Sequence, residues 1–373
     1  MPAKETYCVE THRSHFDTED KCREFLMQVR WNGTPVCHHC QNDRVNYYLS
    51  TRKIFKCSSC KKQFSVTQGT IFERSKVPLT KWFKAMYYFT NGKRGVSSIQ
   101  LGKWLGVKQH TAWFMQHRLR EALKDENNII LRGIVEADEC HIGPDISRNK
   151  RLQIAKKNHK EEQLKNNELP RRTRNKLGIK FKRGRKKGST KEVLQQKKIE
   201  REGRPYDSHE SEKNIIPFEK VTVVLGMMER NGRVVMKKLG KSIKCINRKE
   251  VFPHLINHIH RDSTLITDEH VVYDATSEIF NEHLSVNHQK GYVINGVHIN
   301  SIENAWNHFQ RTIDGTYFHI SYRHFDRYLD ENTFRLNRRN ESAESLFQSL
   351  VPLIFGKRLT YKKLIEKEVK LAA

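Results

Sequence analysis

Four cysteines occur as two closely spaced pairs near the start of the chain. Cys37 and Cys40 form one CxxC pair, and Cys57 and Cys60 form a second after about 16 residues. A CxxC turn presents two thiolates to one ion, and four soft sulfur ligands complete the tetrahedral shell that zinc prefers. We expect one structural zinc ion held by all four, because a segment this short cannot bury a core of its own.

Two alternatives concern the same segment. His38 and His39 lie inside the first pair and could compete as ligands, although we expect both to be exposed. A redox dithiol needs only one isolated CxxC pair, so two pairs favour zinc. The remaining four cysteines are scattered, which favours a reducing compartment over a secreted disulfide scaffold.

Carboxylates recur near the ends of predicted elements further along the chain. An apolar run from Ile129 leads into an acidic cluster around Asp138, and STLITDEHVVYD predicts a strand that ends at Asp268. SIENAWNHFQRTI predicts an amphipathic helix with Glu303 near its start. We expect the other acids nearby to be merely solvated, namely Glu136, Glu139, Glu269 and Asp274.

The elements that carry these acids follow a mixed α/β order. VTVVLGMMERNGRVVMKKLG predicts two strands joined by a turn at Asn231 and Gly232. KEVFPHLINHIH predicts a helix broken early by Pro253. A later helix in RYLDENTFRLNRR is either an ordinary solvated helix or one with a basic face formed by Arg335, Arg338 and Arg339.

Three short amphipathic helices are predicted between Pro78 and Lys124, and the last two flank a turn near Gly106. This is the pattern of a helix-turn-helix, with an ordinary helical hairpin between two domains as the alternative. The start of its second helix would face base edges with Lys108, Gln109, His110 and Thr111. Arg118 and Arg120 could meet phosphates.

The charge balance points to a polyanionic partner. The 373 residues include 69 Lys plus Arg against 42 Asp plus Glu, a formal charge of +27. Nucleic acid is the expected partner, although a basic surface such as ribosome-associated proteins carry is the alternative. We expect no membrane association, because we find no run of about 18 apolar residues and no apolar signal-peptide core.

Much of the positive charge lies in an insertion over 147–215 that is poor in large apolar residues. We expect it to be mobile without DNA. Arg183 and Arg185 lie in KRGRKKG, which is similar to an AT-hook that enters a narrow minor groove, but the usual following proline is missing. A general phosphate-binding tether is the preferred interpretation, and a nuclear-localisation signal would require a source cell with a nucleus.

Three motifs together resemble the Merlin-like superfamily of insertion-sequence transposases, and the resemblance covers most of the chain, including the cysteine pairs. The motifs are VEADECHIG, TDEHVVYD and VHINSIENAWNHFQRTIDGTYFHISYRHFDRYLDENTFRLNRR. The resemblance implies a ribonuclease-H-like fold with a DDE triad at Asp138, Asp268 and Glu303. Carboxylate oxygens suit hard cations, so we expect two Mg²⁺ or Mn²⁺ ions per active site.

The chain departs from that family in two places. Relatives often carry a lysine about seven residues after the third acid, where this chain has Gln310, so Arg311 is expected to take over the phosphate contact. Some relatives use asparagine in the third metal position, which makes Asn300 the second choice after Glu303. His288 and His298 lie in motifs similar to the family's and could position a phosphate or the third helix.

The predicted fold class is multidomain α+β. It comprises an N-terminal helical segment over 1–30, a zinc ribbon over 31–75, a helix-turn-helix DNA-binding segment over 76–127, a ribonuclease-H-like mixed α/β catalytic domain over 128–345 and a C-terminal helical tail over 346–373.

The expected function is transposition. The enzyme would bind double-stranded DNA at the ends of its element, cleave it, and join the 3′-hydroxyl ends to target DNA. Two ends must be paired, so at least a dimer on DNA is expected. The alternatives are a zinc-ribbon regulator derived from a transposase, or a nuclease of the same fold without strand transfer. We expect a cytoplasmic, nucleoid-associated protein, or a nuclear one if the source is eukaryotic.

Overall fold

The structure, a computed structural model, describes residues 7–44, 46–124, 128–142, 222–241, 245–286 and 297–366. The chain divides into two compact units, of which one comprises residues 1–142 and 222–373 and the other residues 143–221. The predictions for the insertion 147–215, for Arg183 and Arg185, and for His288 fall outside the described residues. All that follows concerns the first unit.

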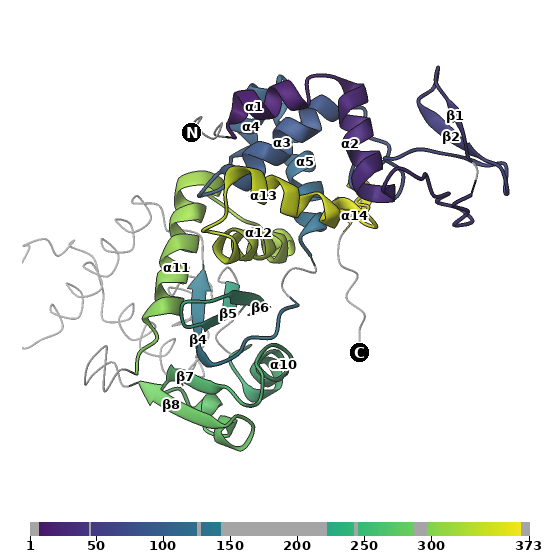
Figure 1. The fold of residues 1–373 in the computed structure, drawn as a ribbon. Helices are drawn as coiled ribbons and strands as arrows, with labels where there is room; N and C mark the ends of the chain where they lie inside the picture. The colour runs from purple at the N-terminus through teal and green to yellow at the C-terminus, as the bar shows by residue number, and fades with distance from the viewer. Residues whose placement is uncertain are drawn as a thin grey trace, which may run out of the picture. The chain divides into compact units, whose positions relative to one another are not determined.

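The N-terminal part combines two helices with a small antiparallel sheet (Figure 1). The helices are α1 (Val9–His15) and α2 (Glu19–Trp31), and the sheet has the order β1 (Asn46–Leu49), β2 (Ile54–Cys57) and β3 (Gln63–Phe64). Phe55 and Phe64 are buried, and each packs its ring against the edge of Trp31. Because so few apolar residues line this sheet, its core depends on the end of α2.

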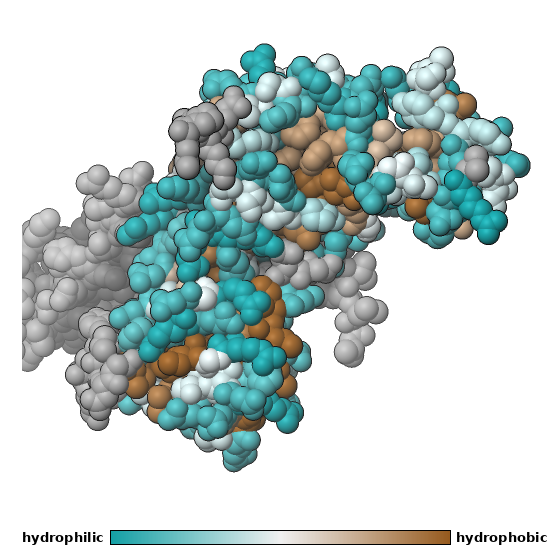
Figure 2. Space-filling model, viewed as in Figure 1, coloured by the Kyte–Doolittle hydropathy of each residue, from teal (hydrophilic) through white to brown (hydrophobic). Residues whose placement is uncertain are grey.

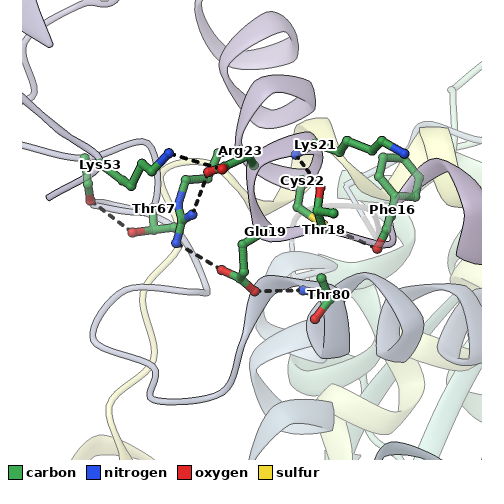
Figure 3. A network of polar contacts seen from close by, with 11 residues as sticks. Phe16, Thr18, Glu19, Lys21, Cys22, Arg23, Lys53, Thr67 and Thr80 are labelled. Carbon is green, nitrogen blue, oxygen red and sulfur yellow. Dashed lines mark hydrogen bonds and ion pairs between the residues drawn. The ribbon is translucent and has the colours of Figure 1, made fainter. Parts of the chain in front are cut away.

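Polar contacts on α2 join the sheet to the next helix, as Figure 3 shows. Glu19 accepts from Arg23 Nη2 at 3.0 Å and from the backbone N–H of Thr80 at 3.2 Å. On the same helix, Asp20 accepts from Lys53 Nζ at 3.1 Å, which comes from the β1–β2 turn. Helix α2 therefore connects the small sheet to α3 through the adjacent side chains of Glu19 and Asp20.

Three helices follow as the sequence predicts: α3 (Leu79–Asn91), α4 (Ser98–Leu105) and α5 (Gln109–Ala122). Ser97 caps α4 by accepting from the backbone N–H of Gln100. Gly106 ends α4 with a φ of 61°, the left-handed conformation that glycine adopts without steric cost. The predicted turn between the last two helices is therefore confirmed.

A five-stranded sheet with the order β6-β5-β4-β7-β8 forms the second part. Its strands are β4 (Ile134–Ile142), β5 (Thr222–Glu229), β6 (Val234–Gly240), β7 (Thr264–Asp268) and β8 (Glu282–Val286). β4, β5 and β6 pair antiparallel, whereas β7 and β8 run parallel to β4. The β5–β6 turn confirms the predicted hairpin, and Asn231 takes a φ of 60° there.

Helices α10 (Arg248–His258) and α11 (Asn300–Thr312) pack against this sheet. Alternate residues along its strands belong to two separate buried apolar clusters, so both faces of the sheet are covered. Figure 2 shows hydrophilic residues over most of the visible surface. The predicted break at Pro253 is wrong, since α10 continues through it after Asn247 caps the first turn.

Helix α12 (Phe325–Asn337) lies between β6 and α5, and α13 (Ala343–Leu350) and α14 (Tyr361–Ile365) follow it. Glu331 of α12 is buried and accepts from Arg120 Nε of α5 at 2.6 Å and from Tyr317 Oη at 2.7 Å. Arg335 pairs with the same carboxylate and donates to the carbonyl of Phe89. The predicted basic face is therefore wrong for Arg335, whose guanidinium is buried and binds Glu331 and the carbonyl of Phe89.

None of the helices that the structure describes is both long and apolar enough to cross a membrane.

Candidate active site and DNA-facing residues

Asp138 and Asp268 lie on the two central strands that run parallel to each other. β4 pairs with β7 from Ile134 opposite Thr264 to Glu136 opposite Ile266. Asp138 and Asp268 each lie two residues beyond the last of these pairs, so they hold equivalent positions on the two strands. Residues at one level of adjacent parallel strands point to the same face, so the two carboxylates share a face.

The strand that carries Asp138 is longer than predicted. We expected the acid at the end of an apolar strand, but β4 continues to Ile142 and pairs with β5 from Val135 to Ile142. Its pairing with β7, by contrast, ends at Glu136. Asp138 therefore lies just beyond the paired stretch of β4 and β7, while it is still paired with Gly226 of β5.

Helix α11 covers this face and contacts Asp138 directly. Trp306 Nε1 donates to Asp138 Oδ2 at 3.1 Å. Gly226 lies opposite Asp138 on β5, and a Cβ there would come within 2.4 Å of Trp306 Cζ2. The helix approaches the sheet this closely because Gly226 has no side chain.

Glu303 lies in the first turn of α11, one turn before Trp306, and is partly buried. Asn300, the second choice for the third ligand, is the first residue of the same helix and lies in the same turn. Burial and the nearby charges of Asp268 and Glu303 raise the pKa of Asp138 to about 6, although the bond from Trp306 opposes this shift. The charges of Asp268 and Glu303 therefore reach Asp138.

The three acids are not yet close enough to share an ion directly. Among the described residues, only the four cysteines bring three or more candidate ligand atoms within 4.8 Å of one another. No salt bridge to Asp138, Asp268 or Glu303 is found in the described ranges, so no basic side chain neutralises them there. Unneutralised hard oxygen donors fit a divalent cation.

Glu139 corrects our expectation of a solvated acid. It is half-buried and accepts from Tyr273 Oη at 2.5 Å. Burial raises its pKa to about 7 despite that bond, and the charges of Asp268 and Asp138 add to the effect. Tyr273 follows β7, in a 3₁₀ turn over Val271–Tyr273, so the pair ties the segment after Asp268 to β4.

Glu136 also corrects that expectation, because its side chain is completely buried. It accepts from the backbone N–H of Ser301 at 2.8 Å, and His298 Nδ1 lies 3.4 Å from it. His298 thus lies beside the start of α11, which favours the alternative that it positions the helix. Glu269 and Asp274 are exposed, as expected.

Strand alternation could have revealed the buried glutamate. Glu136 and Asp138 are two residues apart on one strand, so they share a face. A central strand covered on both sides leaves no solvated position at its middle. The sequence contained no such signal for Trp306, because a tryptophan on an amphipathic helix is ordinarily a core residue.

The four cysteines of the small sheet come together as expected. Cys37 Sγ lies 3.7 Å from Cys60 Sγ, and Cys40 Sγ lies 3.6 Å from Cys57 Sγ. The four sulfurs all lie within 4.8 Å of one another, and no histidine belongs to this cluster. His38 and His39 are exposed. The cluster fits a structural zinc ion with four sulfur ligands.

The two halves of this cluster repeat one backbone geometry. The N–H of Gln41 donates to the carbonyl of Cys37, and the N–H of Lys61 donates to the carbonyl of Cys57. Gln41 and Lys61 each follow the second cysteine of a pair, and both have a φ of 60°. Equivalent turns therefore present the two thiol pairs to each other.

Only part of the predicted DNA surface is available at α5. Lys108, Gln109 and His110 are exposed at its N-terminal end, as base contacts would require. Arg118 is instead buried and donates to the carbonyls of Ile71 and Glu73, so its predicted phosphate contact is wrong in this structure. The same correction applies to Arg120, which is fully buried against Glu331.

Gln310 and Arg311, which follow Glu303 on α11, differ in their contacts and exposure. Gln310 donates to Asp314 Oδ1 at 3.0 Å and so remains on the helix surface. Arg311 is exposed, and no ion pair to it is found among the described residues. It is therefore accessible to a phosphate.

Two family models match the chain. The ISXO2-like transposase domain matches residues 180–337, and the transposase zinc-ribbon domain matches residues 17–63. The first match includes Asp268 and Glu303 but begins after Asp138. The second includes all four cysteines of the cluster.

Two curated relatives are similar in sequence. An uncharacterized protein in transposable element ISH50 of Halobacterium salinarum is 33% identical over 129 residues, which cover 34% of this chain and 43% of that protein. An uncharacterized transposase-like protein of Haemophilus influenzae is 30% identical over 106 residues, which cover 28% of this chain and 84% of that protein. The chain thus spans less than half of the length of the first relative. No solved structure matches.

Proposed function

We propose that this chain, which belongs to the ISXO2-like transposase family, cuts DNA at the ends of a mobile element and joins those ends to target DNA. The observation that carries the proposal is that Asp138 and Asp268 hold equivalent positions just beyond the paired stretch of two adjacent parallel strands, and that the charges of Asp268 and Glu303 act on Asp138. Acids brought together from distant parts of a chain repel one another unless a cation or a proton neutralises them.

The sheet order supports a ribonuclease-H-like catalytic domain. Three antiparallel strands are followed by two strands parallel to the first. The resemblance places the acids on the first strand, after the fourth strand and on a following helix. In this chain those elements are β4, β7 and α11.

The triad would hold two Mg²⁺ or Mn²⁺ ions through carboxylate oxygens of Asp138, Asp268 and Glu303. Such ions, when bound, lower the pKa of an attacking water or hydroxyl and stabilise charge on the leaving oxygen. Trp306 orients Asp138 by donating to one of its oxygens. No side chain of the protein need become covalently attached to DNA.

The reaction proceeds in two phosphoryl transfers. Water attacks a phosphorus at the element end, the bond between phosphorus and the 3′-oxygen breaks, and a 3′-hydroxyl is released. That hydroxyl then attacks a phosphorus of the target, and the 3′-oxygen of the target strand leaves. Both steps need the attacking and leaving oxygens in line, which the shared site provides.

Substrate selection would come from other parts of the chain. Lys108, Gln109 and His110 are exposed at the start of α5, where a recognition helix contacts base edges. The cysteine cluster would fold the zinc ribbon that adds a second DNA contact, and Arg311 would meet a phosphate. Two element ends must meet in one complex, so we infer at least a dimer on DNA.

The test is cleavage and strand transfer on element-end DNA with Mg²⁺. Asp138→Ala, Asp268→Ala and Glu303→Ala should each lose activity by more than about 1,000-fold while still binding DNA. Asp262→Ala is the matched control, since this acid is exposed at the other end of β7. Undiminished activity in one triad variant would remove that residue from the site.

Further outcomes separate the alternatives. An inactive Asn300→Ala with an active Glu303→Ala would replace Glu303 by Asn300 as the third ligand. Cleaved DNA without joined products would indicate a nuclease. Binding of element ends without any cleavage would indicate a regulator.

A further inference from the structure

A buried carboxylate connects the strand that carries Asp138 to the helix that carries Glu303. The side chain of Glu136 has no exposed surface. One of its oxygens accepts from the backbone N–H groups of Ser301 and Ile302 at 2.8 and 3.2 Å, and the other accepts from Ser301 Oγ at 3.0 Å. All three donors belong to the first turn of α11.

Helix α11 provides no cap of its own. Its N-cap residue, Ile299, has no side chain that could accept a hydrogen bond. The first N–H groups of a helix lack partners within the helix, and leaving them buried without partners is costly. Glu136 satisfies two of them from another element, and its negative charge lies at the positive end of the helix dipole.

Arg230 holds this carboxylate in place from the other side. Arg230 Nε donates to Glu136 Oε1 at 3.3 Å, and Arg230 Nη2 donates to the carbonyl of His298 at 3.1 Å. His298 Nδ1 lies 3.4 Å from the same oxygen. The carboxylate is thus compensated and fixed in orientation, as a buried charge must be.

Glu136 and its partner Ser301 lie close in sequence to Asp138 and Glu303, respectively. Glu136 precedes Asp138 by two residues on β4, and Ser301 precedes Glu303 by two residues on α11. We propose that Glu136 is a positioning residue that fixes the separation of Asp138 and Glu303, a role that rests on the proposed function. Its capping bonds set where α11 begins over the sheet, and the bond from Trp306 to Asp138 sets the next turn.

The experiment compares Glu136→Ala, Glu136→Gln and Ser301→Ala in the full-length chain. Glu229→Gln is the matched control, because Glu229 also accepts from two backbone N–H groups, those of Arg132 and Arg233, but its hydrogen bonds and ion pair in the described residues do not involve α11. Amide hydrogen exchange without divalent cations would report the first turn of α11. Cleavage of element-end DNA over a range of Mg²⁺ concentrations would report the separation of the acids.

We expect Glu136→Ala to speed exchange at Ser301 and Ile302 by about 10- to 100-fold. It should also raise the Mg²⁺ concentration for half-maximal cleavage by about 10-fold or more, because the ligands no longer share one geometry. Glu136→Gln retains an oxygen that can accept from the helix and should recover most of both properties. Ser301→Ala removes one of the three donors and should produce a smaller change in the same direction.

Two results would overturn the proposal. One is an unchanged Mg²⁺ requirement in Glu136→Ala with faster exchange, which would leave Glu136 a helix cap only. The other is an unchanged exchange rate at Ser301 and Ile302. If Glu136→Ala does not fold, Ser301→Ala and Glu136→Gln decide the question by the same two measurements. A wild-type protein that does not cleave element ends would instead reject the proposed function.

Discussion

Trp306 Nε1 donates to Asp138 Oδ2 at 3.1 Å, and this bond joins α11 to β4 at the proposed active site. The backbone of Glu139 also forms a hydrogen bond with this carboxylate. The bond from Trp306 competes with burial, which raises the pKa of Asp138 to about 6. A change at Trp306 should therefore alter both the orientation and the pKa of Asp138.

Trp306→Phe should keep the packing of α11 and lose this bond. Hydrogen bonds to charged groups contribute roughly 1.5–3 kcal/mol, so we expect cleavage to fall by about 10- to 100-fold. Single-turnover cleavage of element-end DNA at saturating Mg²⁺ measures this fall in rate. Trp104→Phe is the control, since Trp104 is exposed on α4 and should keep wild-type cleavage. Equal rates for both variants would contradict a role for the bond.

Gly226→Ala should force α11 away from the sheet. The added Cβ would lie 2.4 Å from Trp306 Cζ2 and 2.6 Å from Ile302 Cδ1, and overpacking of this kind costs about 1–3 kcal/mol. Denaturant unfolding and cleavage should both show the loss. Gly315→Ala is the matched control, because a Cβ at Gly315 would meet nothing within 4 Å. A Gly226→Ala protein as stable as that control would show that the helix can move without cost.

The stability of the metal-free protein should depend on the protonation of Asp138. Its pKa is about 3.8 ordinarily and about 6 in the folded protein, so the folded state binds the proton more tightly than the unfolded state does. Stability therefore falls as the pH rises from about 4 to about 6, and the loss persists above that interval. Asp138→Asn removes this contribution.

Thermal unfolding of wild type and Asp138→Asn without divalent cations measures the effect. The stability of the wild type should decline relative to the variant across this interval, whereas Asp262→Asn should follow the wild type. Parallel curves for wild type and Asp138→Asn would show that the folded protein does not shift the pKa of this acid.

Loss of one cysteine ligand should unfold the small sheet. Apart from its cysteines, this sheet buries little more than Phe55 and Phe64, so the energy of metal binding replaces a larger core. Cys57→Ser should lower the zinc content from about one ion per chain to almost none, because a structural site needs all four ligands. Cys8→Ser, which alters a cysteine outside the cluster, should retain zinc. Normal zinc content in Cys57→Ser would contradict the four-cysteine site.

Glu331→Gln should be strongly destabilising. It removes the charge that compensates Arg120, whose side chain is completely buried, and breaking such a pair costs about 3–5 kcal/mol. Asp20→Asn alters solvent-accessible pairs with Arg23 and Lys53 and should cost less than about 1 kcal/mol. Denaturant unfolding measures the free energy of unfolding of both variants. Similar decreases would show that the buried pair contributes no more to stability than the solvent-accessible ones.

The sequence was sufficient to predict features that depend only on neighbouring residues. The CxxC pairs, the Asn-Gly turn and the glycine after α4 each follow from neighbouring residues, and the structure contains them. The sequence did not show the fate of individual charges, because their partners are distant. Arg120 was expected at a phosphate, yet its partner Glu331 is more than 200 residues away along the chain. Glu136 was expected in solvent, yet it is compensated by residues from two other elements.

The strand pairing beside the proposed site has a consequence for how its first acid is held. Ile142 and Thr222 pair directly, so the hydrogen-bond ladder between β4 and β5 reaches the last residue of β4. The position of Asp138 opposite Gly226 is one rung of that ladder. The alignment of the two strands therefore fixes the place of this acid from both sides along β4, with four further pairs beyond it.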